Sequence, residues 1–195
     1  MQKIIQNALR QSIAVKQSIL DNPIFLEKIA QSAQVLVHAF QRNGKVLFCG
    51  NGGSAADAQH LAAELSGRFY TDRPPLYAEA LHVNPSFVTA VANDYGYDKV
   101  FARMLQAAGQ SGDALVAIST SGNSPSILQA IHVAKEKGLK IIGLTGKTGG
   151  KMADLCDVLL NVPSEDTPRI QEAHILIGHI ICQWVEFEMF PETGE

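Results

Sequence analysis

Residues 46–68 read VLFCGNGGSAADAQHLAAELSGR, and this stretch decides the fold. Its first four residues, 46–49, form an apolar run that is typical of a buried strand. A glycine-rich turn follows at residues 50–53, and Ser54 is a suitable N-cap for an Ala-rich helix to about Leu65. Such a unit collects free backbone N–H groups at the positive end of a helix dipole. The stretch therefore predicts an anion site, with phosphate as the usual anion.

Two polar side chains lie inside the expected helix. His60 and Glu64 are about one helical turn apart, so they point to the same side. Leu61 and Leu65 make the rest of the helix apolar, which indicates that the polar groups face a cavity or each other. A solvated His–Glu pair on a helix is common. An imidazole and a carboxylate near a phosphate turn nevertheless predict an active site.

The composition indicates a compact protein. The chain has 195 residues, of which 46% are hydrophobic, and a net charge of −3, so we expect one domain over residues 1–195 and no nucleic-acid partner. No apolar run is long enough to span a membrane, and the first residues lack the apolar core of a signal peptide. Cys49, Cys156 and Cys182 are widely spaced and are expected to be reduced thiols. These features predict a cytoplasmic protein.

The rest of the chain alternates short apolar segments with helical ones. After the first strand, further strands are expected at residues 77–81, 114–119, 140–144 and 158–162. Helices are expected at residues 2–20, 23–41, 85 to an end near 93–96, 98–108, 125–137, 152–155 and 169–189. Continuously apolar strands between helices favour a parallel sheet covered on both faces. We therefore expect an α/β fold, a three-layer αβα sandwich with a five-stranded, flavodoxin-like parallel sheet.

Two helices precede the first strand. The helix at residues 2–20 carries one apolar stripe. The next begins with Asn22 as N-cap and Pro23 as its first residue, and is expected to run to about Gln41, with Gly44 closing it. These helices pack either on the domain's own sheet or in an oligomer interface, since a first helix before an α/β core has little sheet left to cover. Both interpretations stay open at this point.

A second loop, residues 119–124 (STSGNS), follows the strand expected at 114–119. Both loops lie at carboxyl ends of strands, where ligands bind in parallel α/β folds. Ser119, Thr120, Ser121 and Ser124 surround one glycine, and hydroxyls together with backbone amides can bind a phosphate without a cation. Since neither loop contains lysine or arginine, the pattern favours a single monoester phosphate.

Two other phosphate motifs fit less well. Residues 50–55 satisfy a loose dinucleotide fingerprint, but the acidic residue at the required distance, Asp72, lies before the second strand. The segment 146–148 (GKT) lacks the glycine that a nucleoside-triphosphate loop has five positions earlier, where this chain has Ile141.

The closing helix carries polar groups on an apolar background. Gln171 and His179 share one broad face of this helix. His179 is flanked by isoleucines at positions 177, 180 and 181, so it is either a partnered core histidine or a functional one. His174 stays ambiguous.

Together these motifs resemble the sugar isomerase (SIS) domain family, and most closely its aldose–ketose isomerases for seven-carbon sugar phosphates. The serine loop alone marks the SIS domain, whereas the set with Glu64, Gln171 and His179 marks the isomerases. The likeness runs through nearly the whole chain in the family's order. The matching segments are 49–54 (CGNGGS), 57–60 (DAQH), 64–68 (ELSGR), 92–96 (ANDYG), 118–124 (ISTSGNS), 144–147 (LTGK), 149–152 (GGKM) and 169–174 (RIQEAH).

The resemblance implies isomerisation of sedoheptulose 7-phosphate to D-glycero-D-manno-heptose 7-phosphate through an enediolate. This is the first step toward the ADP-heptose or GDP-heptose precursors of lipopolysaccharide core and related glycans. It also implies a cytoplasmic homotetramer with active sites between subunits. Glu64 and His179 match the family's proposed acid/base pair. Our own hypothesis is that Glu64 is the base over C1 and C2 and that His179 is the acid at the sugar oxygens.

The resemblance also assigns binding residues. The phosphate contacts match Ser54, Ser119, Thr120, Ser121 and Ser124, and the sugar contacts match Asn51, Gly52, Gly53, Asp94 and Gln171. A zinc site seen in some members matches His60, Glu64, Gln171 and His179. Spacing alone does not indicate zinc, because glutamine is an unusual ligand.

Two other functions stay open. One relative in the family binds the replication initiator protein, is not known as an isomerase, and lacks the carboxylate that Glu64 supplies. A sugar-phosphate-sensing SIS protein would bind ligand without turnover.

The chain departs from the family pattern at one position. Some members carry an acidic residue just before Arg169, where this chain has Pro168, so the substrate contacts of residues 164–168 also stay open.

Overall fold

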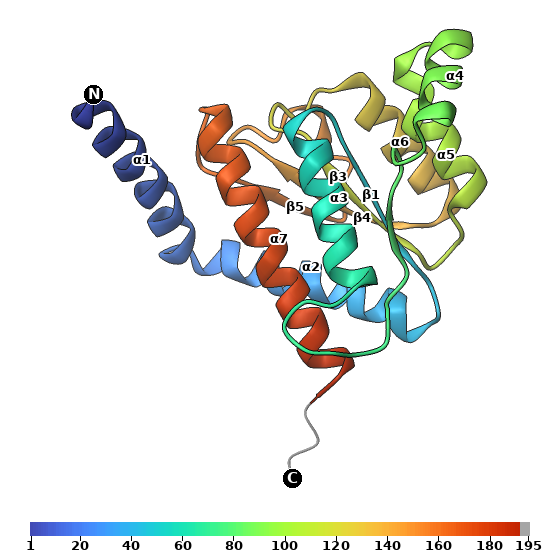
Figure 1. Cartoon of the computed structure of the whole chain (residues 1–195), viewed down its shortest axis with the longest axis horizontal. Helices are drawn as coiled ribbons and strands as arrows, with labels where there is room; N and C mark the ends of the chain where they lie inside the picture. Colours follow the sequence, from blue (N-terminus) through green and yellow to red (C-terminus); the bar gives the residue numbers. More distant parts are fainter. Residues whose placement is uncertain (192–195) are drawn as a thin grey trace.

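The computed structural model describes residues 1–191 and contains a five-stranded parallel sheet, in the order β2-β1-β3-β4-β5 (Figure 1). The sheet order reverses between β1 and β3, and ligands in such sheets bind outside the carboxyl ends of the strands at this point. This confirms the predicted flavodoxin-like topology. The strands are β1 (Val46–Gly50), β2 (Ala78–Ala80), β3 (Ala114–Ile118), β4 (Lys140–Thr145) and β5 (Val158–Asn161).

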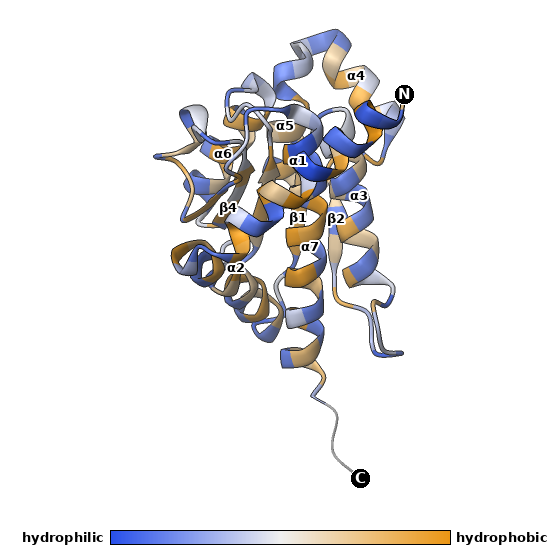
Figure 2. Cartoon of the chain, turned by 90° about the vertical axis from the view of Figure 1, so that its left-hand side faces the viewer, coloured by the Kyte–Doolittle hydropathy of each residue, from blue (hydrophilic) through white to orange (hydrophobic). Residues whose placement is uncertain are grey.

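Helices cover both faces of the sheet, as the apolar strands predict. Along β1, Val46 and Phe48 pack toward α2, α3 and α7, whereas Leu47 and Cys49 pack toward α4, α5 and α6. Apolar residues are prominent on α2 and α7 in Figure 2. The α-helices are α1 (Gln2–Leu20), α2 (Pro23–Gln41), α3 (Gly53–Ser66), α4 (Pro85–Tyr95), α5 (Val100–Ala108), α6 (Pro125–Lys137) and α7 (Thr167–Met189), with 3-10 turns η1 (Tyr97–Lys99) and η2 (Gly150–Met152).

Helix α1 projects from the body of the protein (Figure 1). It contacts α2 and α7, and Arg169 of α7 donates a hydrogen bond to its Ala8 carbonyl over 3.0 Å. Ile4 is 75% exposed, and Leu9 and Ile13 are exposed as well. Much of the apolar stripe of α1 is therefore exposed, and the chain's own sheet does not cover it.

Three local expectations are wrong in detail. Helix α3 is capped by Gly52, with φ +57°, and Ser54 lies buried in the first turn instead of capping it. Helix α2 ends at Gln41 as expected, but Asn43 and not Gly44 adopts the left-handed conformation after it, which asparagine tolerates. The helix expected at 152–155 is the 3-10 turn η2.

No helix among residues 1–191 combines the length and the apolar character that crossing a membrane requires. The three cysteines are free thiols, and burial raises the pKa of Cys156 and Cys182 to about 12. At that pKa both thiols stay protonated near neutral pH and act as packing groups.

Candidate active site

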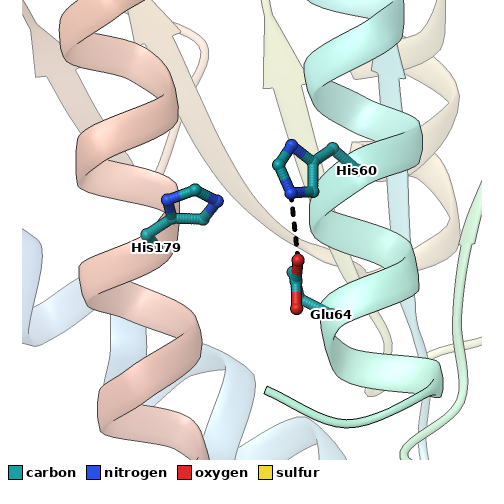
Figure 3. Close-up of side chains that lie close together, drawn as sticks. All are labelled: His60, Glu64 and His179. Atoms are coloured by element: carbon teal, nitrogen blue, oxygen red, sulfur yellow. Dashed lines mark hydrogen bonds and ion pairs between the residues drawn. The ribbon is translucent and has the colours of Figure 1, made fainter. Parts of the chain in front are cut away.

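Helices α3 and α7 lie side by side and bring three predicted residues together (Figure 3). His60 and Glu64 project from α3, with His60 Nε2 and Glu64 Oε1 2.9 Å apart, and His179 projects toward them from α7. The two imidazole rings meet edge to face, with centroids 4.9 Å apart. One nitrogen of each ring and one carboxylate oxygen all lie within 4.8 Å of one another. We call these three residues the trio.

A glycine lets the two helices approach this closely. Gly178 of α7 faces Leu61 of α3, and a Cβ at position 178 would lie 2.5 Å from both Leu61 Cδ atoms. Any side chain at this position would push α7 away from α3 or displace Leu61. The residues next to this contact, His60 and His179, are thereby held across a narrow gap.

The His179 side chain has a nitrogen atom that is available to a ligand. Its Nε2 is buried and has no hydrogen-bond partner among the described residues. Burial lowers the pKa of His179, His60 lowers it further, and Glu64 partly opposes this. The ring is therefore neutral near pH 7, and according to its tautomer Nε2 offers an N–H or a lone pair to whatever enters the site. The Phe69 ring also packs against the His179 ring, with centroids 5.7 Å apart.

The trio also fits a metal ion. Two histidines and one glutamate are among the ligand sets of catalytic zinc, which binds nitrogen and oxygen at about 2.0–2.2 Å. Donor atoms within 4.8 Å of one another need only small side-chain rotations to reach such distances. The unpartnered Nε2 of His179 supports this assignment, because a buried polar atom without a partner is costly.

Gln171, the fourth residue of the predicted zinc site, is placed elsewhere. Its amide packs on Gly53 at the start of α3, where a Cβ would lie 2.6 Å from the Gln171 side-chain nitrogen. Gly53 precedes His60 by about two helical turns, or about 10 Å. The role of Gln171 as a zinc ligand therefore stays a prediction, whereas the position of Gln171 beside the first loop suits contact with a sugar.

Two of the five predicted phosphate residues line a cleft at the start of α7. The cleft of about 320 Å³ lies between the loops after β3 and β4 and the first turn of α7. Thr120 and Ser121 line it, as do Thr167 and Ile170 of α7. The positive end of the α7 dipole is thus added to the hydroxyls. Ser54, Ser119 and Ser124 do not line the cleft; Ser54 and Ser119 are buried, and Ser119 Oγ donates to Ser124 Oγ over 3.2 Å.

The first loop, residues 50–53, forms hydrogen bonds with neighbouring segments. Asn51 Nδ2 donates to Ser126 Oγ over 3.0 Å, and the Tyr97 hydroxyl donates to Asn51 Oδ1 over 3.0 Å. Gly52 and Gly53 are exposed, which leaves their backbone free for a ligand. Asp94 lies exposed at the end of α4 and accepts a hydrogen bond from Asn93 over 2.9 Å. The structure brings the turn after Asp94 to the first loop through Tyr97.

Three further site residues were not predicted. Lys147, on the loop after β4, lines the cleft together with Glu165, and its Nζ lies 3.6 Å from Glu165 Oε1, so the cleft holds an ion pair although neither predicted loop contains a cation. The adjacency of β3 and β4 could have revealed it. Asp57, one turn before His60, has a buried oxygen without a partner among the described residues, and burial raises its pKa, with His60 opposing. Nothing in the sequence placed Phe69 beside His179.

The surroundings of His174 show its role. It is fully buried, and its Nε2 donates to the Thr145 carbonyl over 3.1 Å. Burial lowers the pKa of His174 to about 4, although the hydrogen bond to Thr145 opposes this shift. His174 is therefore a neutral core residue that fastens α7 to the end of β4.

Comparisons with known proteins agree with this fold and site. Residues 15–146 match the model of the SIS domain. The chain is 52% identical to a phosphoheptose isomerase of Aneurinibacillus thermoaerophilus over 97% of its own length and 96% of that protein. It is 50% identical to one from Sulfurimonas denitrificans, with 98% of each chain covered.

The solved structures give the same result. A phosphoheptose isomerase from Neisseria gonorrhoeae superposes with a TM-score of 0.88 at 44% identity, covering 94% of this chain and 98% of the other. The chain belongs to the SIS domain family and, within it, to the phosphoheptose isomerases, which are aldose–ketose isomerases.

Proposed function

We propose that this protein converts sedoheptulose 7-phosphate into D-glycero-D-manno-heptose 7-phosphate. The observation that carries the proposal is the trio of His60, Glu64 and His179, which combines a carboxylate and two imidazoles as acid–base groups. Helix α7 carries His179, and its first turn borders a separate cleft that is lined by hydroxyls. Hydroxyls of this kind suit the phosphate of a sugar phosphate.

The phosphate is proposed to bind in the cleft. Thr120 and Ser121 line the cleft, and the loop that holds them also carries Ser119 and Ser124. The first turn of α7 supplies favourable charge. Binding the unreactive phosphate positions the reacting carbons over the trio, which lowers the entropic part of the barrier.

Glu64 is proposed as the base. It takes the proton from C1 of the ketose as O2 gains a proton from His179, which gives an enediol. Return of the carbon-bound proton to C2, with loss of the O1 proton, forms the aldehyde. His179 is neutral, so it moves protons through an imidazole N–H, as the neutral histidine of triosephosphate isomerase does.

Zinc is the proposed cofactor, held by His60, Glu64 and His179, with Gln171 as the fourth predicted ligand. When bound, zinc would polarise the carbonyl and stabilise the negative oxygen of the intermediate. The side-chain chemistry of the trio and the unpartnered His179 Nε2 support it.

We also propose that residues 1–195 act as one domain within a cytoplasmic homotetramer. The exposed apolar stripe of α1 supports self-association, because a row of isoleucine and leucine side chains gains free energy when it is covered. Light scattering of the purified protein tests the assembly. A monomer at micromolar concentration would contradict it.

The test of activity is direct. The purified protein is incubated with sedoheptulose 7-phosphate, with added zinc or with a chelator, and the sugar carbons are followed by NMR. We expect an aldoheptose 7-phosphate to appear, and to appear faster with zinc. Binding without conversion in both samples would favour the adaptor or the sensor, although the carboxylate of Glu64 argues against the adaptor.

A further inference from the structure

A buried ion pair joins the two helices that carry the trio. Arg73, in the segment between α3 and β2, donates from Nε to Glu186 Oε2 of α7 over 3.1 Å. The two side chains are 3% and 5% exposed. Burying two charges costs desolvation energy, which is offset only when further hydrogen bonds satisfy both groups. Those further bonds show what the pair holds in place.

Glu186 fixes the chain that leaves α3. Its Oε1 accepts from the N–H groups of Tyr70 and Thr71 over 2.8 and 3.0 Å, and its Oε2 accepts from the N–H of Phe69 over 3.1 Å. Burial alone raises the pKa of the Glu186 carboxyl, but the hydrogen bonds from Thr71, Tyr70, Phe69 and Arg73 outweigh it and lower the pKa. The carboxylate therefore stays charged and fully bonded near neutral pH.

Arg73 fixes the end of α3 itself. Its Nη2 donates to the Glu64 carbonyl over 2.8 Å, and its Nη1 donates to the carbonyls of Leu65 and Gly67 over 2.7 and 3.2 Å. The last carbonyls of a helix lack partners within the helix, and a cation is favourable at that end. The backbone of Glu64 is thus bound directly by the guanidinium group.

We propose that Arg73 and Glu186 are positioning residues that set the distance between Glu64 on α3 and His179 on α7. Glu186 follows His179 by two turns of the same helix, so it lies on nearly the same face. The N–H that Glu186 binds belongs to Phe69, whose ring lies 5.7 Å from that of His179. One ion pair therefore holds the backbone of the base and the aromatic residue that packs against the acid. This inference rests on the proposed function.

The first test is Glu186→Gln. Each oxygen of Glu186 faces two N–H donors, so the NH₂ group of glutamine meets donors whichever way the amide turns. We expect kcat on sedoheptulose 7-phosphate to fall about 10–100-fold, and Co²⁺ binding, followed by visible absorption, to weaken about 10–100-fold. KM should stay near the wild-type value, because the phosphate cleft is formed by other elements.

Arg73→Lys is the second variant. Lysine keeps the charge but cannot reach the glutamate and the helix carbonyls at once, since it lacks the planar fork. We expect the same pattern, with a smaller loss of kcat and of cobalt affinity than in Glu186→Gln. If Glu186→Gln does not fold by circular dichroism, Arg73→Lys provides the comparison.

Asp113→Asn is the matched control. Asp113 is also a buried carboxylate in an ion pair, 2.7 Å from Lys45 Nζ, and it accepts from the N–H groups of Lys45 and Gln110. It lies at the amino ends of β1 and β3, away from the trio. We expect this variant to lose thermal stability while keeping kcat and cobalt affinity.

The outcomes separate the two proposals. A folded Glu186→Gln variant with wild-type kcat and cobalt affinity overturns the positioning role. So does a loss of kcat that Asp113→Asn reproduces at an equal loss of Tm, because the effect would then be general destabilisation. A wild-type protein that neither turns over the sugar phosphate nor binds cobalt overturns the proposed function instead.

Discussion

The two ends of the candidate active site are built in different ways. The cleft proposed for the phosphate is made by loops at the ends of β3 and β4 and by the first turn of α7, and two of its hydroxyls, on Thr120 and Ser121, are neighbours in the sequence. The trio combines side chains of two helices that are far apart in the sequence, held close by Gly178 against Leu61. Loops at strand ends therefore form the cleft, whereas helix packing forms the trio. Substitutions at the two ends should change different kinetic constants.

The largest expected effect is that of Glu64→Gln at the trio. The amide keeps the size of the side chain but cannot accept the carbon-bound proton, so kcat should fall about 10²–10⁴-fold. KM should change little, because the cleft is intact. Steady-state kinetics with sedoheptulose 7-phosphate measure both constants. Near-normal turnover would rule out Glu64 as the base.

The next largest effect is a loss of stability at low pH that comes from His174 and distinguishes it from His179 on the same helix. His174 has a pKa of about 4 in the folded protein against 6.5 ordinarily, so below about pH 6.5 the unfolded chain binds more protons. Its contribution to stability is complete above that pH and is lost as the pH falls toward 4. At about pH 5 this loss should reach about 2 kcal/mol relative to neutral pH.

Urea unfolding at neutral pH and at about pH 5 measures this loss. His174→Gln, which keeps a donor for the Thr145 carbonyl, should show a smaller loss than the wild type. An equal loss in both proteins would show that other groups cause the pH dependence. The comparison also separates stability from catalysis, since His174 does not belong to the trio.

The smallest effect is expected at the cleft. Thr120→Val removes one hydroxyl from a phosphate site while keeping the shape of the side chain. The loss of one hydrogen bond to a charged group should raise KM about tenfold, with kcat nearly unchanged. Thr89→Val is the control, because its hydroxyl binds only its own helix α4. A fall in kcat without a change in KM would place the phosphate elsewhere.

The same contrast explains what the sequence could predict. The turns at residues 50–53 and 119–124, each after a strand, were predicted because glycine, serine and asparagine indicate turns locally. The alternation of strands and helices also predicted the layers and the sheet. His60 and Glu64 were paired correctly because a helical turn joins them.

What required the structure was long-range packing. Lys147 reaches the cleft because β4 lies beside β3. Phe69 lies beside His179 of α7, where Glu186 of the same helix binds the Phe69 N–H. The burial of His174 depends on where α7 meets β4, which no residue pattern within α7 shows. For the same reason, the sequence did not show what α1 packs against.

Helix α7 has a consequence for the choice of substrate. Its first turn borders the phosphate cleft and its middle carries His179, and an α-helix held by its own hydrogen bonds cannot be stretched or shortened easily. On the proposed function, the helix fixes the distance between the cleft and His179. We therefore expect a sugar phosphate whose carbonyl lies too few carbons from its phosphate to reach one of these two places but not both, so that the protein backbone, and no single side chain, selects the chain length.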